Sequence, residues 1–139
     1  MLSRPRVGVY AFILFVAAAL TPAFYVCVSD DSQRAHGIAG LVPLLLGWLG
    51  PTEGVFSWYA NPFLIAAIIF LRRNRTPPLW MSAPGLLLVL TAFVPFSFPI
   101  NEAGPAWPVC GLGIGYFLWL GTAFLVFAAS IAPSAVRTD

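Results

Sequence analysis

The stretch Arg72-Arg73-Asn74-Arg75 decides how this chain is interpreted, because it holds three of only seven positive charges and lies between two long uncharged segments. The chain contains no lysine. In membrane proteins, short loops rich in Arg or Lys stay on the cytoplasmic side of the bilayer. The cluster therefore predicts a cytoplasmic loop that joins two hydrophobic segments.

The composition favours lipid over water as the solvent of this chain. Of its 139 residues, 60% are hydrophobic and 9% are charged, whereas soluble domains are about 45–50% apolar and about 25% charged. A chain of this length has too little interior to bury such an apolar excess. The net charge is only +2 and the arginines are dispersed, so we predict the lipid bilayer as a partner and no nucleic acid.

Four uncharged segments are predicted to span a membrane: residues 7–28, 55–71, 79–100 and 112–132. As a helix, the first would reach about 33 Å, and the hydrocarbon core is about 30 Å thick. Its apolar run is longer than that of a secretory signal peptide, and no small-residue cleavage site closes it. We therefore predict an uncleaved first span, with a cleaved signal peptide as the alternative.

Residues 37–50 are also apolar, but as a helix they would reach only about 21 Å. Their glycines fall on one helical face, which lets another backbone approach closely; they are Gly37, Gly40, Gly47 and Gly50. We predict a short re-entrant or interfacial helix here. The predicted fold is thus all-α: a single-domain integral membrane helical bundle of four transmembrane helices plus this short helix. A five-span chain, in which residues 37–50 also cross, is the alternative.

The distribution of arginines predicts the orientation. With four spans, one arginine lies outside, Arg34, and six lie in the cytoplasm: Arg4, Arg6, Arg72, Arg73, Arg75 and Arg137. Both termini are then cytoplasmic. The five-span alternative puts the N-terminus outside, and both arrangements put Arg72–Arg75 inside and residues 101–108 outside.

No Asp, Glu, Lys, Arg or His lies within a predicted span, which argues against a proton-coupled carrier or a voltage sensor. The other polar candidates are predicted to face outward, without the spacing of metal ligands or of a nucleophile and its base; they are Asp30, Asp31, His36, Glu53, Asn101 and Glu102. We therefore predict no catalytic residue, no metal site and no cofactor. A membrane enzyme would have to depend on His36, Glu53 or Glu102.

The two cysteines, Cys27 and Cys110, fall at the outer ends of predicted spans. An oxidising periplasm would allow a disulfide between them. The alternative is a pair of unbridged, small apolar side chains.

Two features predict close helix packing. Gly111 and Gly115 have the spacing that brings helices together, either within the molecule, for example against the glycine face of residues 37–50, or with a second copy. Asn61, which lies within a predicted span, is expected to bond across helices or to the carbonyl that Pro62 frees.

Two local patterns resemble small bacterial inner-membrane proteins with four spans and no established activity: Gly47–Gly50 continuing to Phe56–Pro62, and Gly113–Leu120, together with Asn101-Glu102. The resemblance covers about a third of the chain. It implies the inner membrane of a bacterium and a four-span layout. We expect a non-enzymatic accessory or interaction protein, with a membrane-protein partner or a second copy of itself. An immunity-type role, shielding the membrane from a toxin, belongs to this class. The alternative is a small-molecule transporter or a channel subunit.

Overall fold

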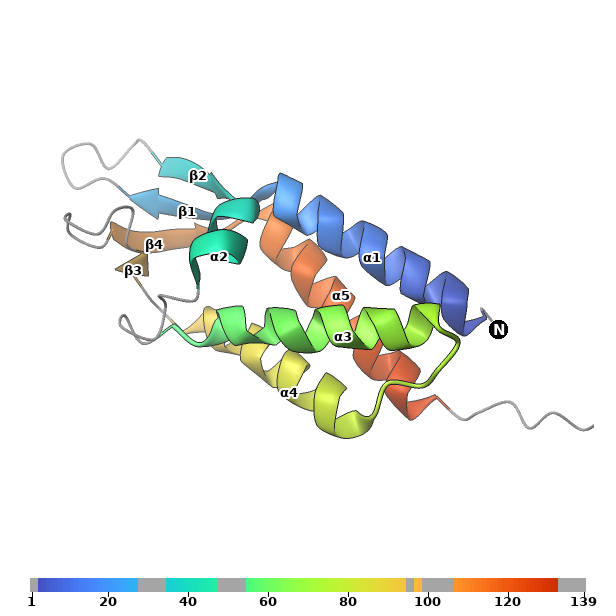
Figure 1. Ribbon diagram of the computed structural model, residues 1–139. Coiled ribbons are helices and arrows are strands. Elements are labelled where there is room, and N and C mark those ends of the chain that lie inside the picture. The colour runs from blue at the N-terminus through green and yellow to red at the C-terminus, as the bar shows by residue number, and fades with distance from the viewer. Residues whose placement is uncertain (1–2, 28–34, 48–54, 95–96, 99–106, 133–139) are drawn as a thin grey trace, which may run out of the picture.

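The computed structural model describes residues 3–27, 35–47, 55–94, 97–98 and 107–132. Four helices lie side by side, and an antiparallel sheet extends from one end of them (Figure 1). The elements in chain order are α1 (Arg4–Leu20), β1 (Pro22–Cys27), β2 (Ala35–Ala39), α2 (Leu41–Leu46), the 3-10 turn η2 (Ser57–Tyr59), α3 (Ala60–Arg72), α4 (Leu79–Leu90), the 3-10 turn η3 (Thr91–Phe93), β3 (Ser97–Phe98), β4 (Trp107–Leu112) and α5 (Ile114–Ile131).

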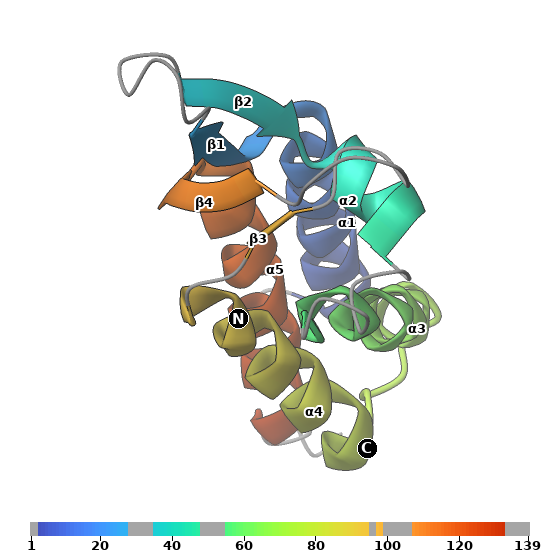
Figure 2. The same ribbon diagram turned by 90° about the vertical axis from the view of Figure 1, so that its left-hand side faces the viewer.

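The prediction of an all-α, four-span bundle is wrong. The strands form a sheet in the order β2-β1-β4-β3, so the fold is mixed α/β (Figure 2). Strands occupy parts of the predicted spans 7–28, 79–100 and 112–132, and β2 occupies the start of the predicted helix 37–50. Among the described helices, α5 alone is both long and apolar enough to cross a membrane; the apolar stretches Ser57–Arg72 and Leu79–Phe93 are shorter.

The first predicted span divides into a helix and a strand because of Pro22. If the helix continued, the Pro22 ring would clash with the carbonyl one turn back. Proline also pushes the residue before it into an extended conformation. Thr21 has φ −109° and ψ 159°. Beyond the proline, Phe24, Tyr25 and Val26 are aromatic or β-branched, which favours a strand. Phe24 and Val26 are buried and Tyr25 is exposed, the alternation of a half-buried strand.

The sheet continues the packing of two helices. α1 leads directly into β1 and β4 leads directly into α5, and both the helix pair and the strand pair lie against each other. The backbone amide of Gly113 donates to the carbonyl of Ala23 (2.8 Å), and the amide of Gly40 donates to the carbonyl of Thr21 (2.9 Å). A Cβ added at Gly115 would lie 2.7 Å from the carbonyl oxygen of Thr21. The end of α1 is therefore enclosed by glycine backbones, which fixes the sheet relative to the helices.

Two apolar clusters hold the helices together, one at each end. The cluster nearer the sheet joins α3, α4 and α5, and it consists of Ala60, Leu64, Leu86, Val89, Ala92, Tyr116 and Ala123. The cluster at the opposite end adds α1, and it consists of Ala11, Ala67, Ile68, Leu71, Met81 and Val126. Gly8 supports this second contact, since a Cβ there would lie 2.9 Å from the backbone nitrogen of Arg72.

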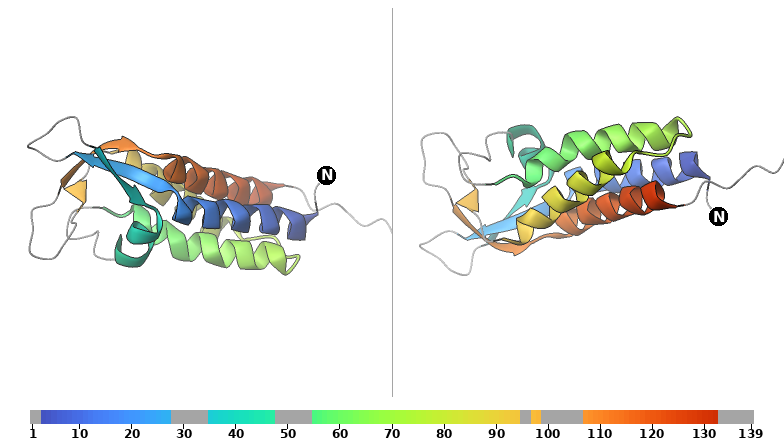
Figure 3. Two further views of the ribbon diagram at one scale, coloured as in Figure 1. Left: turned by 90° about the horizontal axis from the view of Figure 1, so that it is seen from above. Right: turned by 90° about the horizontal axis from the view of Figure 1, so that it is seen from below.

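The described arginines gather at the end of the helices that faces away from the sheet (Figure 3). Asn74 ends α3 in the left-handed conformation, with φ 58°. The amide of Arg75 donates to the carbonyl of Phe70 (2.9 Å) and that of Asn74 to Leu71 (3.0 Å), a C-terminal cap in which Asn is tolerated at the left-handed position. The Arg72 guanidinium lies 5.4 Å from the centroid of the Phe12 ring. The chain thus has a cationic end and a sheet end.

Candidate functional site: the disulfide-bridged sheet

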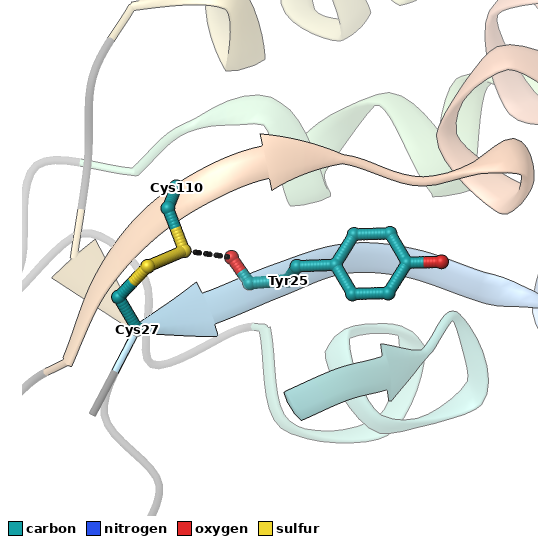
Figure 4. Close-up of a disulfide and its surroundings, with 3 residues drawn as sticks. All are labelled: Tyr25, Cys27 and Cys110. Atoms are coloured by element: carbon teal, nitrogen blue, oxygen red, sulfur yellow. Dashed lines mark hydrogen bonds between the residues drawn. A yellow bond between two sulfur atoms is a disulfide. The ribbon is translucent and has the colours of Figure 1, made fainter. Parts of the chain in front are cut away.

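The sheet end carries a disulfide between Cys27 of β1 and Cys110 of β4, with the two Cα atoms 5.9 Å apart (Figure 4). Tyr25 pairs with Gly111 and Val26 with Val109, so Cys110 is an extra residue on β4. Such a bulge redirects a side chain, and here Cys110 lies beside Cys27. The Cys110 sulfur also lies 3.5 Å from the carbonyl oxygen of Tyr25. This is a contact, not a hydrogen bond, because a bridged sulfur carries no hydrogen.

Tyr25 lies on the same face of the sheet as the disulfide, between two glycines. It pairs with Gly37 of β2 and with Gly111 of β4. A Cβ added at Gly37 would lie 3.2 Å from Cε1 of the Tyr25 ring, and one at Gly111 would lie 4.0 Å from Cδ2. The glycines thus leave room for the ring against both neighbouring strands. The aromatic ring of Tyr25 is therefore exposed next to the disulfide.

The opposite face of the sheet is apolar and holds its own small core. Phe24 is 6% exposed and Val26 is fully buried, and they pack with Ala23, Ile38, Trp107 and Val109. Residues directly opposite each other on antiparallel strands share a face, so His36, which pairs with Val26, lies on this side. The disulfide and the core therefore stabilise the sheet from its two faces.

Of the polar residues predicted to face outward, the structure describes His36, which is exposed on β2. Asp30, Asp31, Glu53, Asn101 and Glu102 lie outside the described residues, as do Arg34, Arg137 and Gly50. Within the described ranges, no group of three His, Cys, Asp or Glu side chains lies together as a metal site.

The predicted packing residues have different neighbours from those expected. Gly111 lies in strand β4, so it and Gly115 do not form a helical pair; Gly115 instead packs against the end of α1. Gly47 packs against the Trp58 ring, not against Gly111 or Gly115. Pro62 lies in the first turn of α3, where its missing N–H costs no intrahelical bond.

Asn61 is buried in α3, and its Oδ1 accepts a hydrogen bond from the indole N–H of Trp119 in α5 (3.0 Å). A second cross-helix bond runs from the Tyr116 hydroxyl to the carbonyl of Val89 (3.1 Å). Sequence reasoning assigned no packing role to Tyr116, Trp119, Gly8 or Gly113. The only signal for the two glycines was a missing side chain, within the apolar helix α1 at Gly8 and directly before α5 at Gly113.

Comparison with protein-family models, with curated proteins and with solved structures finds no match for this chain. Its resemblance to small bacterial inner-membrane proteins therefore stays a prediction.

Proposed function

We propose that this is a non-enzymatic interaction protein of a bacterial inner membrane, which holds its helices in the bilayer and displays the disulfide-bridged sheet on the outer side. The Tyr25 face of the sheet is the interaction surface in this proposal. The observation that carries it is the distribution of exposed apolar side chains between the cationic end and the sheet.

Large apolar side chains cover the outside of the helices. Only five of the 18 residues of α5 are buried, whereas the core helix of a soluble protein is mostly buried. Contiguous apolar surface of this kind marks contact with lipid or protein. The exposed set on the helices includes Val9, Tyr10, Phe12, Ile13, Val16, Ile65, Ile69, Leu87, Phe117 and Phe124. On α1 no charged residue follows Arg6, and on α3 none precedes Arg72. α4 and α5 contain no charged residue.

The depth of the other helices follows from α5. An 18-residue helix is about 27 Å long, close to the hydrocarbon thickness of about 30 Å. α1 and α4 pack along α5, and α3 packs along α1 and α4, so a bilayer that surrounds α5 also surrounds their exposed apolar sides. Aromatic residues suit the two interfaces: Trp80 is 68% exposed near the arginines, and Trp58 contacts Tyr59 at the sheet end.

The sheet belongs in water. An open sheet edge in hydrocarbon leaves backbone N–H and C=O groups without partners, and β2 and β3 are the edges of this sheet. Disulfides persist in oxidising compartments such as the periplasm, and arginine-rich loops stay in the cytoplasm. The disulfide and the Arg72–Arg75 loop lie at opposite ends of the helices, so both rules support one orientation.

A pair of matched arginine substitutions tests the embedding. Phe124 and Phe56 are each 51% exposed, but Phe124 lies within α5 and Phe56 precedes η2 at the sheet end. An arginine at the centre of a membrane helix costs about 2.5–3.5 kcal/mol, whereas an exposed substitution on a soluble protein changes stability by about 0.5 kcal/mol or less. We expect Phe124→Arg to lower the amount of folded, carbonate-resistant protein in the membrane fraction several-fold and Phe56→Arg to leave it near the wild-type amount. Equal behaviour of the two variants contradicts the embedding.

The interaction surface is tested by photocrosslinking in living cells. A photoreactive phenylalanine analogue at Tyr25 should give a discrete adduct, and the same analogue at Ile69, on the exposed side of α3, should give none of that mass. The yield of the adduct should fall when Cys27 and Cys110 are both replaced by Ser, because the disulfide fixes β1 against β4 and so fixes the position of Tyr25. An adduct that forms equally from Ile69 contradicts a role for the sheet.

A further inference from the structure

The short helix α2 has an apolar face that nothing in the described residues covers. Leu41 is 44% exposed, Val42 37%, Leu45 63% and Leu46 47%, and none of the six residues of α2 is buried. At 100° per residue, these four positions share one side of the helix. A helix of about one and a half turns would be unstable with these aliphatic side chains exposed to water.

The other side of α2 is attached to the protein. The indole N–H of Trp58 donates to the carbonyl of Leu44 (2.8 Å). A Cβ at Gly47, next in the chain after α2, would run into the Trp58 ring. An amphipathic helix at the membrane surface normally turns a polar side to water. In α2 that side contacts the protein instead, so α2 can lie at the membrane interface without polar residues.

The position of α2 matches the outer boundary of the exposed apolar side chains. It lies beside the sheet-side ends of α1 and α3 (Figure 2). Gly40, its N-terminal neighbour, bonds to Thr21 directly after α1, and Trp58 lies in η2, which directly precedes α3. Leu20, the last residue of α1, is 71% exposed and lies at the same end of the helices as α2. α2 thus adjoins the sheet-side end of α1, where exposed apolar side chains also lie.

We propose that α2 is an anchor in the outer leaflet, with Leu41, Val42, Leu45 and Leu46 inserted among lipid acyl chains just below the headgroups. This rests on the proposed embedding of the helices and specifies their outer boundary. Acyl chains are the favoured occupant because the face is wholly aliphatic, carries no charge and adjoins the side chains already assigned to lipid. Since α2 is joined to β2 by Gly40, the anchor sets the height and tilt of the sheet above the bilayer.

Spin-label accessibility tests the anchor on the full chain in phosphatidylcholine vesicles. Both native cysteines are bridged, so a nitroxide reagent modifies only an introduced cysteine under non-reducing conditions. Labels are placed at Leu45→Cys and, as a second anchor position, Leu41→Cys. Ile69→Cys on α3 is the control for lipid, and His36→Cys on β2 is the control for water. Residue 36 lies on the face of the sheet opposite the disulfide, so the thiol introduced there points away from the disulfide.

We expect the labels at residues 45, 41 and 69 to collide more with oxygen, which concentrates in acyl chains, than with a water-soluble nickel chelate. The label at residue 36 should show the reverse order. A lipid signal at 69 with a water signal at 45 and 41 overturns the anchor and leaves the embedding intact. Shielding of 45 and 41 from both reagents also overturns it, because a protein partner then covers α2. Water signals at 69, 45 and 41 overturn the embedding and the anchor together.

Discussion

At Gly115, a single hydrogen in place of a side chain allows α5 to pack against the end of α1. A Cβ there would lie 2.7 Å from the carbonyl oxygen of Thr21 and 2.8 Å from that of Ala18, whereas a Cβ at Gly121 of the same helix would meet nothing within 4 Å. Gly115→Ala should destabilise the protein by about 1–3 kcal/mol, since overpacking forces the backbones apart. Gly121→Ala should be neutral or stabilise by up to about 1 kcal/mol. Thermal unfolding in detergent distinguishes them, and equal melting temperatures contradict the close contact.

The indole N–H of Trp119 and the side-chain oxygen of Asn61 form a hydrogen bond between α5 and α3. Asn61→Leu removes the acceptor and leaves a partly buried indole N–H unpaired, so we expect a loss of about 1–2 kcal/mol. Trp119→Phe removes the donor, and the double variant should lose less than the sum of the two single losses. Additive losses in a denaturant titration would mean that the two side chains do not interact.

Residues such as Asn61 were identifiable from the sequence because a strong hydrogen-bonding group stands out in an apolar run. Gly113 and Gly8 were not, because their role depends on which backbone approaches them. Gly113 donates to Ala23, and Gly8 lies beside Arg72. Glycine spacing alone predicted a helical pair of Gly111 and Gly115, but Gly111 lies in a strand.

Hydropathy located the apolar segments of the chain but did not separate helix from strand. Phe24, Tyr25 and Val26 are as apolar as the helix before them, so a search for uncharged runs joins β1 to α1. Pro22 and the aromatic and β-branched residues after it were the local signals for a strand. One of the two partners of β1 lies more than 80 residues away, in β4, and no local pattern in the sequence predicts that pairing.

The disulfide between β1 and β4 predicts a specific pattern of variant stabilities. It closes a sequence separation of 83 residues, and crosslinks of this kind contribute about 2–4 kcal/mol. Cys27→Ser, Cys110→Ser and the double variant should each lose the same amount, because any one of them removes the same bond. Thiol counting supplies the control: the wild type should show no free thiol before reduction and two afterwards. A double variant that loses the sum of the single losses contradicts the crosslink as the cause.

The described part of the chain has a cationic end, an apolar middle and a disulfide-bridged end. The first two were predictable, since charge and hydropathy are local properties of the sequence. The sheet was not, because it forms from segments that the sequence presents as the ends of membrane helices. The proposed orientation relates the three parts to one another, with the arginines in the cytoplasm and the sheet outside.

Labelling of single cysteines in intact cells with a membrane-impermeant maleimide tests this orientation most directly. Asn74→Cys keeps every arginine and probes the cationic end, and His36→Cys probes the sheet; both positions are exposed. The account predicts that His36→Cys reacts in intact cells and that Asn74→Cys reacts only after the cells are permeabilised. Reaction of both variants in intact cells, or of Asn74→Cys alone, would contradict it.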